Sequence, residues 1–208
     1  MINDEIVIVA TKNQGKVKEF ARLLEKLNKQ VRSLADVEHV PDIVEDANTF
    51  IENAEKKASI IAKHLNTTVI ADDSGLCVDE LNGAPGIYSA RYAGEHGNDS
   101  LNNKKLLAEL NKLSLEPNQN GCLSKAQFQC ALALVNPASD EVIRVEASCE
   151  GWITNQPRGE HGFGYDPLFY LPQYEKTMAE LDIEEKNKIS HRANALKELY
   201  KVLNSNNG

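Results

Sequence analysis

Short runs of apolar, β-branched residues alternate along this chain with segments in which apolar residues recur every three or four positions. Residues 6–9 (Ile-Val-Ile-Val) and 68–71 (Thr-Val-Ile-Ala) have the length and composition of buried strands. Helical spacing follows residue 16 and recurs over residues 50–65, where Thr49 and Glu52 have capping-box spacing. The first third is therefore predicted to contain two strands and two helices.

The second half continues the same alternation. Asp99 is in position to cap a helix that carries apolar residues between 101 and 110. Residues 126–134 alternate as in a strand, and residues 142–152 form a second strand after a turn, which predicts a hairpin. Ser190 is the expected N-cap of a final helix.

Composition limits the classes of protein to be considered. With 208 residues we expect one domain over residues 1–208. The formal net charge of −8 argues against binding of nucleic acid or of acidic membranes through bulk charge. The four cysteines have no metal-binding or disulfide spacing and are expected to be buried thiols. Because neither a signal peptide nor a membrane-spanning run is visible, we expect a cytoplasmic protein.

The strand at residues 68–71 runs directly into Asp72, Asp73, Ser74 and Gly75. Two adjacent carboxylates at a strand tip need a compensating positive charge. Hard oxygen ligands of this kind suit Mg²⁺, which often bridges carboxylates to substrate phosphates. The alternative is a solvated turn in which Asp and Ser cap backbone N–H groups.

The segment Thr11-Lys12-Asn13-Gln14-Gly15-Lys16 lies between the first strand and the first helix. Helix N-terminal N–H groups, a glycine and two lysines together favour phosphate binding. The segment is not a Walker A loop, because the first glycine of that motif is missing and Val17 replaces its hydroxyl residue. An ordinary capped helix start with solvated lysines is the alternative.

Glycines flank an aromatic residue in Gly162-Phe163-Gly164-Tyr165-Asp166. They would expose the Phe163 ring to a flat nucleobase, and Asp166 could accept a hydrogen bond from a base N–H. The alternative is a tight turn whose aromatic rings fill the core.

Cations gather near the last predicted helix, with Lys186 before it and His191 and Arg192 in its first turn. A cation at a helix N-terminus is unfavourable unless an anionic or carbonyl-rich partner faces it, although a salt bridge would also account for it. Glu45, which precedes another helix, is either a dipole partner or a metal ligand brought to Asp73 by the fold.

Taken together, these stretches resemble the inosine triphosphate pyrophosphatases, which hydrolyse inosine, deoxyinosine and xanthosine triphosphates to the monophosphate and pyrophosphate. The similarity covers nearly the whole chain. It rests on six stretches in the family's order: residues 11–16, 49–54, 71–76, 83–92, 162–167 and 189–192.

The resemblance implies an α/β fold with an elongated mixed central sheet flanked by helices, two lobes with the nucleotide between them, Mg²⁺ dependence and a homodimer. It implies that Asp73 is the proton acceptor and that Glu45 and Asp73 bind the metal. It leaves open whether Asp72 is also a ligand. The implied contacts with the triphosphate are Thr11, Lys12, Asn13, Gln14, Gly15, Lys16 and Lys186. The implied contacts with the base are Phe163, Gly164, Tyr165, Asp166, His191 and Arg192. Ser74 is also implied to contact the substrate.

Three other functions are compatible with parts of the sequence. A phosphatase with an aspartyl-phosphate intermediate would need Asp-x-Asp, whereas Asp72 and Asp73 are adjacent. A related pyrophosphatase would act on other or modified nucleoside triphosphates, and a nucleotide sensor would bind without catalysis.

Overall fold

The computed structural model describes residues 6–25, 30–138 and 141–205. The chain divides into two compact units. The first unit comprises residues 1–73, 130–147 and 191–208, and the second comprises residues 74–129 and 148–190. The strands β3, β4 and β5 each contribute residues to both units.

One seven-stranded sheet has the order β2-β1-β3-β4-β5-β6-β7. β1 is parallel to β2 and to β3, whereas β6 is antiparallel to β5 and to β7, so the sheet is mixed. The strands are β1 (Ile6–Val9), β2 (Gln30–Ser33), β3 (Val69–Val78), β4 (Cys122–Asn136), β5 (Glu141–Thr154), β6 (Phe169–Leu171) and β7 (Lys176–Thr177).

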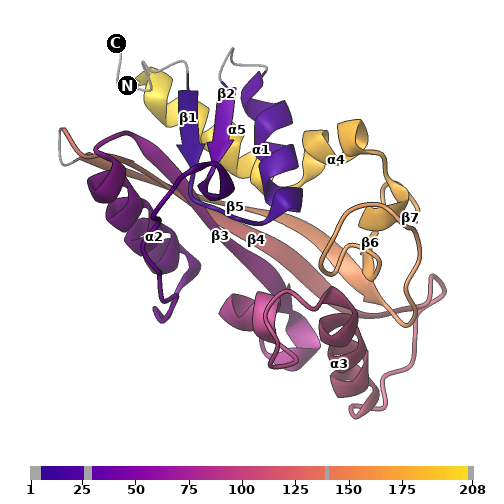
Figure 1. Ribbon diagram of the computed structural model, residues 1–208. Helices are drawn as coiled ribbons and strands as arrows, with labels where there is room; N and C mark the ends of the chain where they lie inside the picture. The colour runs from indigo at the N-terminus through magenta and orange to yellow at the C-terminus, as the bar shows by residue number, and fades with distance from the viewer. Residues whose placement is uncertain (1–5, 26–29, 139–140, 206–208) are drawn as a thin grey trace. The chain divides into compact units, whose positions relative to one another are not determined.

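The helices occupy the segments between the strands and the end of the chain (Figure 1). The α-helices are α1 (Gln14–Glu25), α2 (Phe50–Leu65), α3 (Asp99–Asn111), α4 (Ile183–Ile189) and α5 (His191–Ser205). Short 3₁₀ helices are η1 (Leu34–Asp36), η2 (Asp79–Leu81), η3 (Gly86–Arg91) and η4 (Met178–Glu180).

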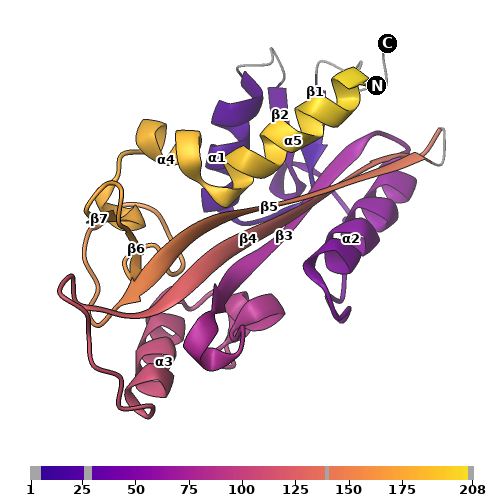
Figure 2. The ribbon, with the colours of Figure 1, turned by 180° about the vertical axis from the view of Figure 1, so that it is seen from behind.

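The first unit has a core of its own. In Figures 1 and 2, α1 and α5 lie on one side of its strands and α2 lies on the other. The apolar positions predicted for the first helix pack here, since Phe20 and Leu24 are buried against Val7 and Val9 of β1. Leu27, which has the same spacing, lies outside the described residues. This core supports the strand that carries the two adjacent carboxylates.

The second unit has a separate core. Helix α3 contributes Leu106 and Leu110, which are fully buried and pack in one cluster with Phe128 and Phe169 from the sheet. The rings of Phe128 and Phe169 lie with centroids 4.4 Å apart. Tyr165 belongs to the same cluster and is 5% exposed.

Most predicted elements are confirmed, including an α/β fold with a mixed sheet and flanking helices. Thr49 is the N-cap of α2, since its side chain accepts the Glu52 N–H. The prediction for Asp99 was wrong, because Asn98 caps α3 and Asp99 is the first helical residue. The predicted hairpin turn includes residues 139–140, which lie outside the described residues. The single domain over residues 1–208, the elongation and the two lobes stay predictions.

All four cysteines lie among the described residues and are free thiols, three of them buried. Among the helices that the structure describes, none combines the length and the apolar character needed to cross a bilayer.

Candidate active site

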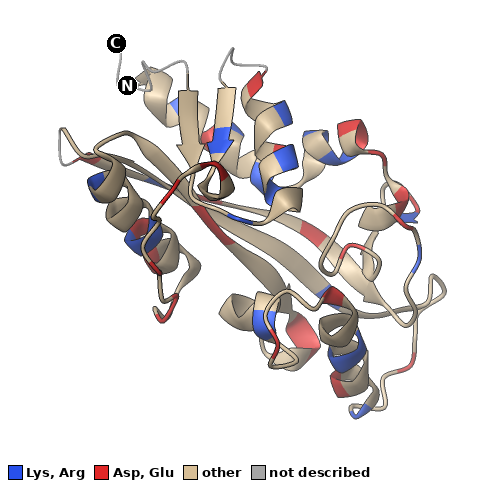
Figure 3. Ribbon diagram, viewed as in Figure 1, with Lys and Arg blue, Asp and Glu red and all other residues tan. Residues whose placement is uncertain are grey.

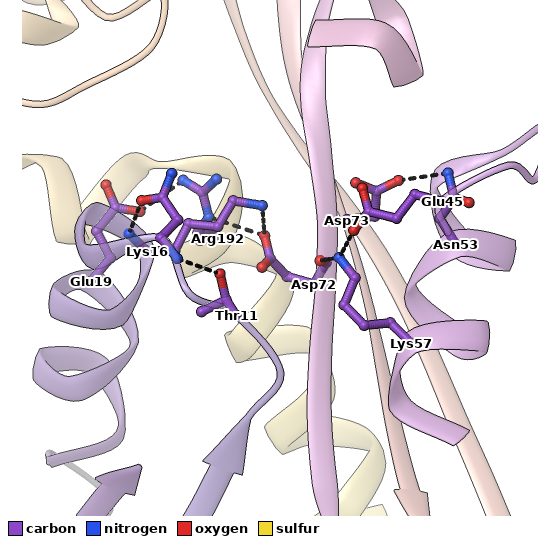
Figure 4. Close-up of polar contacts among 10 residues, drawn as sticks. Thr11, Lys16, Glu19, Glu45, Asn53, Lys57, Asp72, Asp73 and Arg192 are labelled. Carbon is purple, nitrogen blue, oxygen red and sulfur yellow. Dashed lines mark hydrogen bonds and ion pairs between the residues drawn. The ribbon is translucent and has the colours of Figure 1, made fainter. Parts of the chain in front are cut away.

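The two adjacent carboxylates lie inside a strand, not at its tip. β3 continues through Asp72 and Asp73 to Val78, which corrects the prediction of a strand that ends at Ala71. The polar residues can stay in the strand because ion pairs and hydrogen bonds from neighbouring helices satisfy them. Since successive strand residues point to opposite faces, the two carboxylates face different helices. Figure 4 shows Asp72 and Asp73 on opposite sides of β3.

Asp72 faces α1 and α5, where it meets two cations. Its carboxylate lies 2.9 Å from Lys16 Nζ and 3.3 Å from Arg192 Nε, and it is fully buried. Arg192 also pairs with Glu19 at 2.9 Å, and both side chains are at most 4% exposed. Burial alone would raise the pKa of Asp72, but Lys16 and Arg192 hold the pKa well below its usual range. Asp72 is therefore a fixed anion that serves as counterion to two cations.

Glu19 is a member of this cluster that the sequence analysis missed. It lies three positions after Lys16, on the same side of α1, and is buried like the next residue, Phe20. That spacing was the only available signal, because an acidic residue in a charged helix is ordinarily solvated.

Asp73 faces α2, which supplies an amide and an ammonium group. Asn53 Nδ2 donates to Asp73 Oδ2 at 3.0 Å, and Lys57 Nζ donates to the main-chain oxygen of Asp72 at 3.0 Å. Lys57 also forms an ion pair with Glu45, in the segment before α2. In Figure 4 these side chains gather on one side of the strand.

The electrostatic environment of Asp73 is opposite to that of Asp72. Burial raises the pKa of Asp73, the nearby charge of Glu45 adds to the rise, and Lys57 only partly opposes it. Burial would lower the pKa of Lys57, but Glu45, Asp72 and Asp73 raise it overall, so the ammonium stays charged. A carboxylate with a raised pKa beside a fixed cation has the properties of a general base.

Glu45 and Asp73, the two residues expected to bind a metal, are both carboxylates that face Lys57. Within the described part of the chain, no group of three or more His, Cys, Asp or Glu residues could hold a metal ion. The ammonium group of Lys57 pairs with Glu45 and places a positive charge near Asp73. Carboxylate oxygens are ligands of the kind that a hard cation such as Mg²⁺ prefers.

The predicted phosphate segment is accessible at the start of α1. Lys12, Asn13 and Gln14 are exposed, and Thr11 is buried. Asn13 Oδ1 accepts the Lys16 N–H at 3.1 Å, so the helix start is capped locally as the alternative interpretation expected, but the Lys16 ammonium pairs with Asp72 and is not a solvated lysine. Blue ribbon segments, which mark Lys and Arg, recur along α1 in Figure 3, so the segment lies in a basic part of the first unit.

In the second unit, Phe163, Asp166 and Lys186 form one cluster. Asp166 Oδ2 accepts the Phe163 N–H at 2.9 Å and lies 2.6 Å from Lys186 Nζ. The same ammonium lies 4.7 Å from the centre of the Phe163 ring. Asp166 and Lys186 are buried, whereas Phe163 is half-buried. A Cβ at Gly162 would collide with Asp166 Oδ2, so this position requires glycine.

The remaining predicted residues have distinct environments. Tyr165 fills the core of the second unit, as the alternative interpretation expected, and its hydroxyl donates to the Ser89 carbonyl at 2.9 Å. Ser74 is half-buried on β3. α5 begins at His191, as predicted, and His191 is 3% exposed.

α4, which carries Lys186, was not predicted, although its capping box with Asp182 as N-cap is visible in the sequence.

The chain is similar to known proteins over nearly its whole length. The dITP/XTP pyrophosphatase of Bacillus anthracis is 52% identical over 194 residues, covering 93% of this chain and 93% of that protein. The dITP/XTP pyrophosphatase of Bacillus subtilis (strain 168) is 51% identical over 203 residues, covering 98% and 99%. The structure of the Staphylococcus aureus Ham1 protein superposes with a TM-score of 0.80 at 42% identity, covering 97% of this chain and 99% of that one. The model of the Ham1 family matches residues 7–202, and the chain belongs to the Ham1 family.

Proposed function

We propose that this protein is a nucleoside-triphosphate pyrophosphatase that hydrolyses ITP, dITP and XTP to the monophosphate and pyrophosphate. The observation that carries the proposal is identity above 50%, over nearly the full length, to proteins named dITP/XTP pyrophosphatase. The arrangement around Asp73 supports a hydrolytic reaction, because it combines a basic carboxylate with fixed positive charge.

The phosphate chemistry is assigned to residues of the first unit. Negative charge on phosphates repels a nucleophile, and lysines reduce this repulsion. Residues 11–16 would bind the triphosphate, and Lys57 would keep a positive charge beside the reacting group. Asp73 would accept the proton of the attacking water, which its raised pKa favours.

A divalent cation, Mg²⁺ in this proposal, would be held by Glu45 and Asp73. When bound, it would neutralise phosphate charge and lower the pKa of a coordinated water. Asp72 is excluded from the proposed ligands, because its carboxylate faces the other side of β3 and pairs with Lys16 and Arg192.

Recognition of the base is assigned to residues 163–166, Lys186, His191 and Arg192, and Ser74 would contact the substrate. Phe163 would stack on the base, and Asp166, held by Lys186, would present its oxygens to base N–H groups. Lys186, which was expected to contact the triphosphate, is assigned to this group as well, because Asp166 and Phe163 are among its partners. His191 or Arg192 would donate to the 6-oxo group that inosine and xanthine carry and adenine lacks.

The proposal is tested by incubating the protein with ITP and Mg²⁺ and measuring pyrophosphate, with ATP and a pyrimidine triphosphate as comparison substrates. We expect pyrophosphate from ITP in preference to ATP. Release of orthophosphate alone, or a preference for the pyrimidine, would reject it in favour of another phosphohydrolase. Binding without hydrolysis would identify a sensor.

We also propose that the protein is a cytoplasmic homodimer. Light scattering during size-exclusion chromatography would measure the mass, which a monomeric value would contradict. Cell fractionation would test the location.

A further inference from the structure

Helix α3 contacts the proposed base-binding segment through both backbone polar groups of a single glycine. The N–H of Gly164 donates to Asp99 Oδ2 at 2.6 Å, and its carbonyl accepts from Asn103 Nδ2 at 2.8 Å. Asp99 and Asn103 are four residues apart and therefore lie on the same face of α3. We propose that Asp99 and Asn103 are positioning residues that set the conformation of residues 162–166, here called the base loop, and thereby the discrimination between nucleobases.

Asp99 is available for this contact because another residue caps the helix. Asn98 accepts the Leu101 N–H at 3.1 Å, which satisfies the start of α3. An acidic residue in the first helical turn would ordinarily remain solvated near the dipole. The carboxylate of Asp99 instead binds a loop that lies 65 positions away in the sequence.

The conformation of Gly164 makes this contact consequential. Its φ is +63°, and no atom beyond its chain neighbours lies within 4 Å of the place a Cβ would occupy. Packing on that side therefore does not hold this peptide in place. Glycine also has more backbone freedom to lose than any other residue, so the two hydrogen bonds from α3 are the observed restraints on Gly164 itself.

The neighbours of Gly164 are anchored by other means. The Phe163 N–H donates to Asp166 Oδ2, and the Tyr165 hydroxyl donates to the Ser89 carbonyl. The two hydrogen bonds from Asp99 and Asn103 to Gly164, here called the clamp, complete this set of restraints. They hold the base loop in one conformation before a ligand binds. Preorganisation of this kind improves affinity and specificity by reducing the entropy lost on binding.

The two members of the clamp should differ in strength. The bond to Asp99 is charge-assisted and short, whereas the bond from Asn103 is neutral. Asn103 Oδ1 is buried with no hydrogen-bond partner among the described residues. Replacing Asn103 by Leu would remove this unsatisfied acceptor together with the donor, so the loss should be smaller than for Asp99→Ala.

This inference rests on the proposed function, because it assumes that the base loop reads the base. The experiment compares the wild-type protein with Asp99→Ala, Asp99→Asn and the matched control Asn98→Ala, which weakens the same helix start but leaves the clamp intact. KM and kcat are measured for ITP and ATP, and tripolyphosphate, which has no base, serves as an inhibitor. Hydrogen exchange of the Gly164 amide is measured in the ligand-free proteins.

For Asp99→Ala we expect KM for ITP to rise about tenfold with little change in kcat, and the preference for ITP over ATP to shrink. Inhibition by tripolyphosphate should stay unchanged, and exchange of the Gly164 amide should accelerate. Asp99→Asn keeps an acceptor oxygen and should restore most of the preference. Asn98→Ala should leave both the preference and the Gly164 exchange as in the wild type.

The inference is overturned if Asp99→Ala leaves Gly164 exchange or the ITP preference unchanged, or if Asn98→Ala alters the preference equally. It is also overturned if tripolyphosphate inhibition weakens in parallel with KM, which would indicate a general disturbance. A wild-type protein that releases no pyrophosphate from ITP would overturn the proposed function, and with it this role, while the Gly164 exchange would still report on the clamp itself.

Discussion

Asp72 and Asp73 are neighbours in sequence and share one strand, but their surroundings give them opposite chemistry. Asp72 faces Lys16 and Arg192, which hold its pKa well below the usual range and so favour its ionised form. Asp73 faces Glu45 and Lys57, and burial raises its pKa. The comparison teaches that the face of a strand, and not the residue type, decides whether a carboxylate serves as a structural anion or as a base.

The largest expected effect separates the two residues by catalysis. Asp73→Asn should lower turnover of ITP by roughly 10²- to 10⁴-fold while nucleotide affinity persists, because the proton acceptor is lost. Pyrophosphate release measures turnover, and nucleotide titration measures affinity. Asp46→Asn, an exposed substitution with the same charge change, serves as control. Near-normal turnover of Asp73→Asn would reject the assignment of the base.

The loss of unfolding free energy should be larger for substitution of Asp72 than for substitution of Asp73. Asp72→Asn should lower the free energy of unfolding by about 3 kcal/mol, because Lys16 and Arg192 lose a buried counterion. Asp73→Asn should cost much less, because burial disfavours the charged form of Asp73. Urea denaturation without divalent metal measures both. Equal losses would contradict the distinction.

Metal binding gives a third comparison. At a Mg²⁺ concentration tenfold above its dissociation constant, the wild-type protein should gain about 1.4 kcal/mol in unfolding free energy. The gain should disappear in Glu45→Gln and in Asp73→Asn but persist in Asp72→Asn, since Asp72 faces away from the proposed ligands. Thermal denaturation with and without Mg²⁺ provides the measurement. Loss of the gain in Asp72→Asn would place the metal on the other face.

The smallest expected effect is the direction in which the free energy of unfolding of the metal-free protein changes with pH. The folded-state pKa of Asp73 is raised, so above the usual Asp pKa of about 3.9 the native state binds more protons at this residue than the unfolded state does. Asp73 therefore lowers the free energy of unfolding as the pH rises. The free energy of unfolding of Asp73→Asn, taken relative to the wild type, should therefore rise with pH.

Asp72 should behave in the opposite way, because its folded-state pKa is lowered. The contribution of Asp72 to the free energy of unfolding is fully present above the usual Asp pKa and is lost as the pH falls toward the lowered pKa. The penalty for Asp72→Asn should shrink in acid. Denaturation at a series of pH values measures both trends, and a shared sign would contradict them.

The elements with strong periodicity were predictable, because local spacing determines which face an element buries. Strand β1 and helix α2 follow their apolar patterns, and Thr49 caps α2 as its spacing indicated. The extent of β3 was not predictable, since two adjacent carboxylates tolerate the interior of a strand only when partners distant in sequence satisfy them. Asp99 was misjudged for a local reason, because the adjacent Asn98 caps α3, whereas its contact with Gly164 was not predictable because Gly164 is remote in sequence.

The sequence alone determined the family, the main elements and the chemical types of the proposed site, since motifs and periodicity are local properties of the chain. Only the tertiary structure decided which carboxylate is a counterion and which has the environment of a base. It also brought Glu19 to Arg192 and Asp99 to Gly164. The physical reason is that charge pairing and burial depend on neighbours in space, and these come from elements that the sequence keeps far apart.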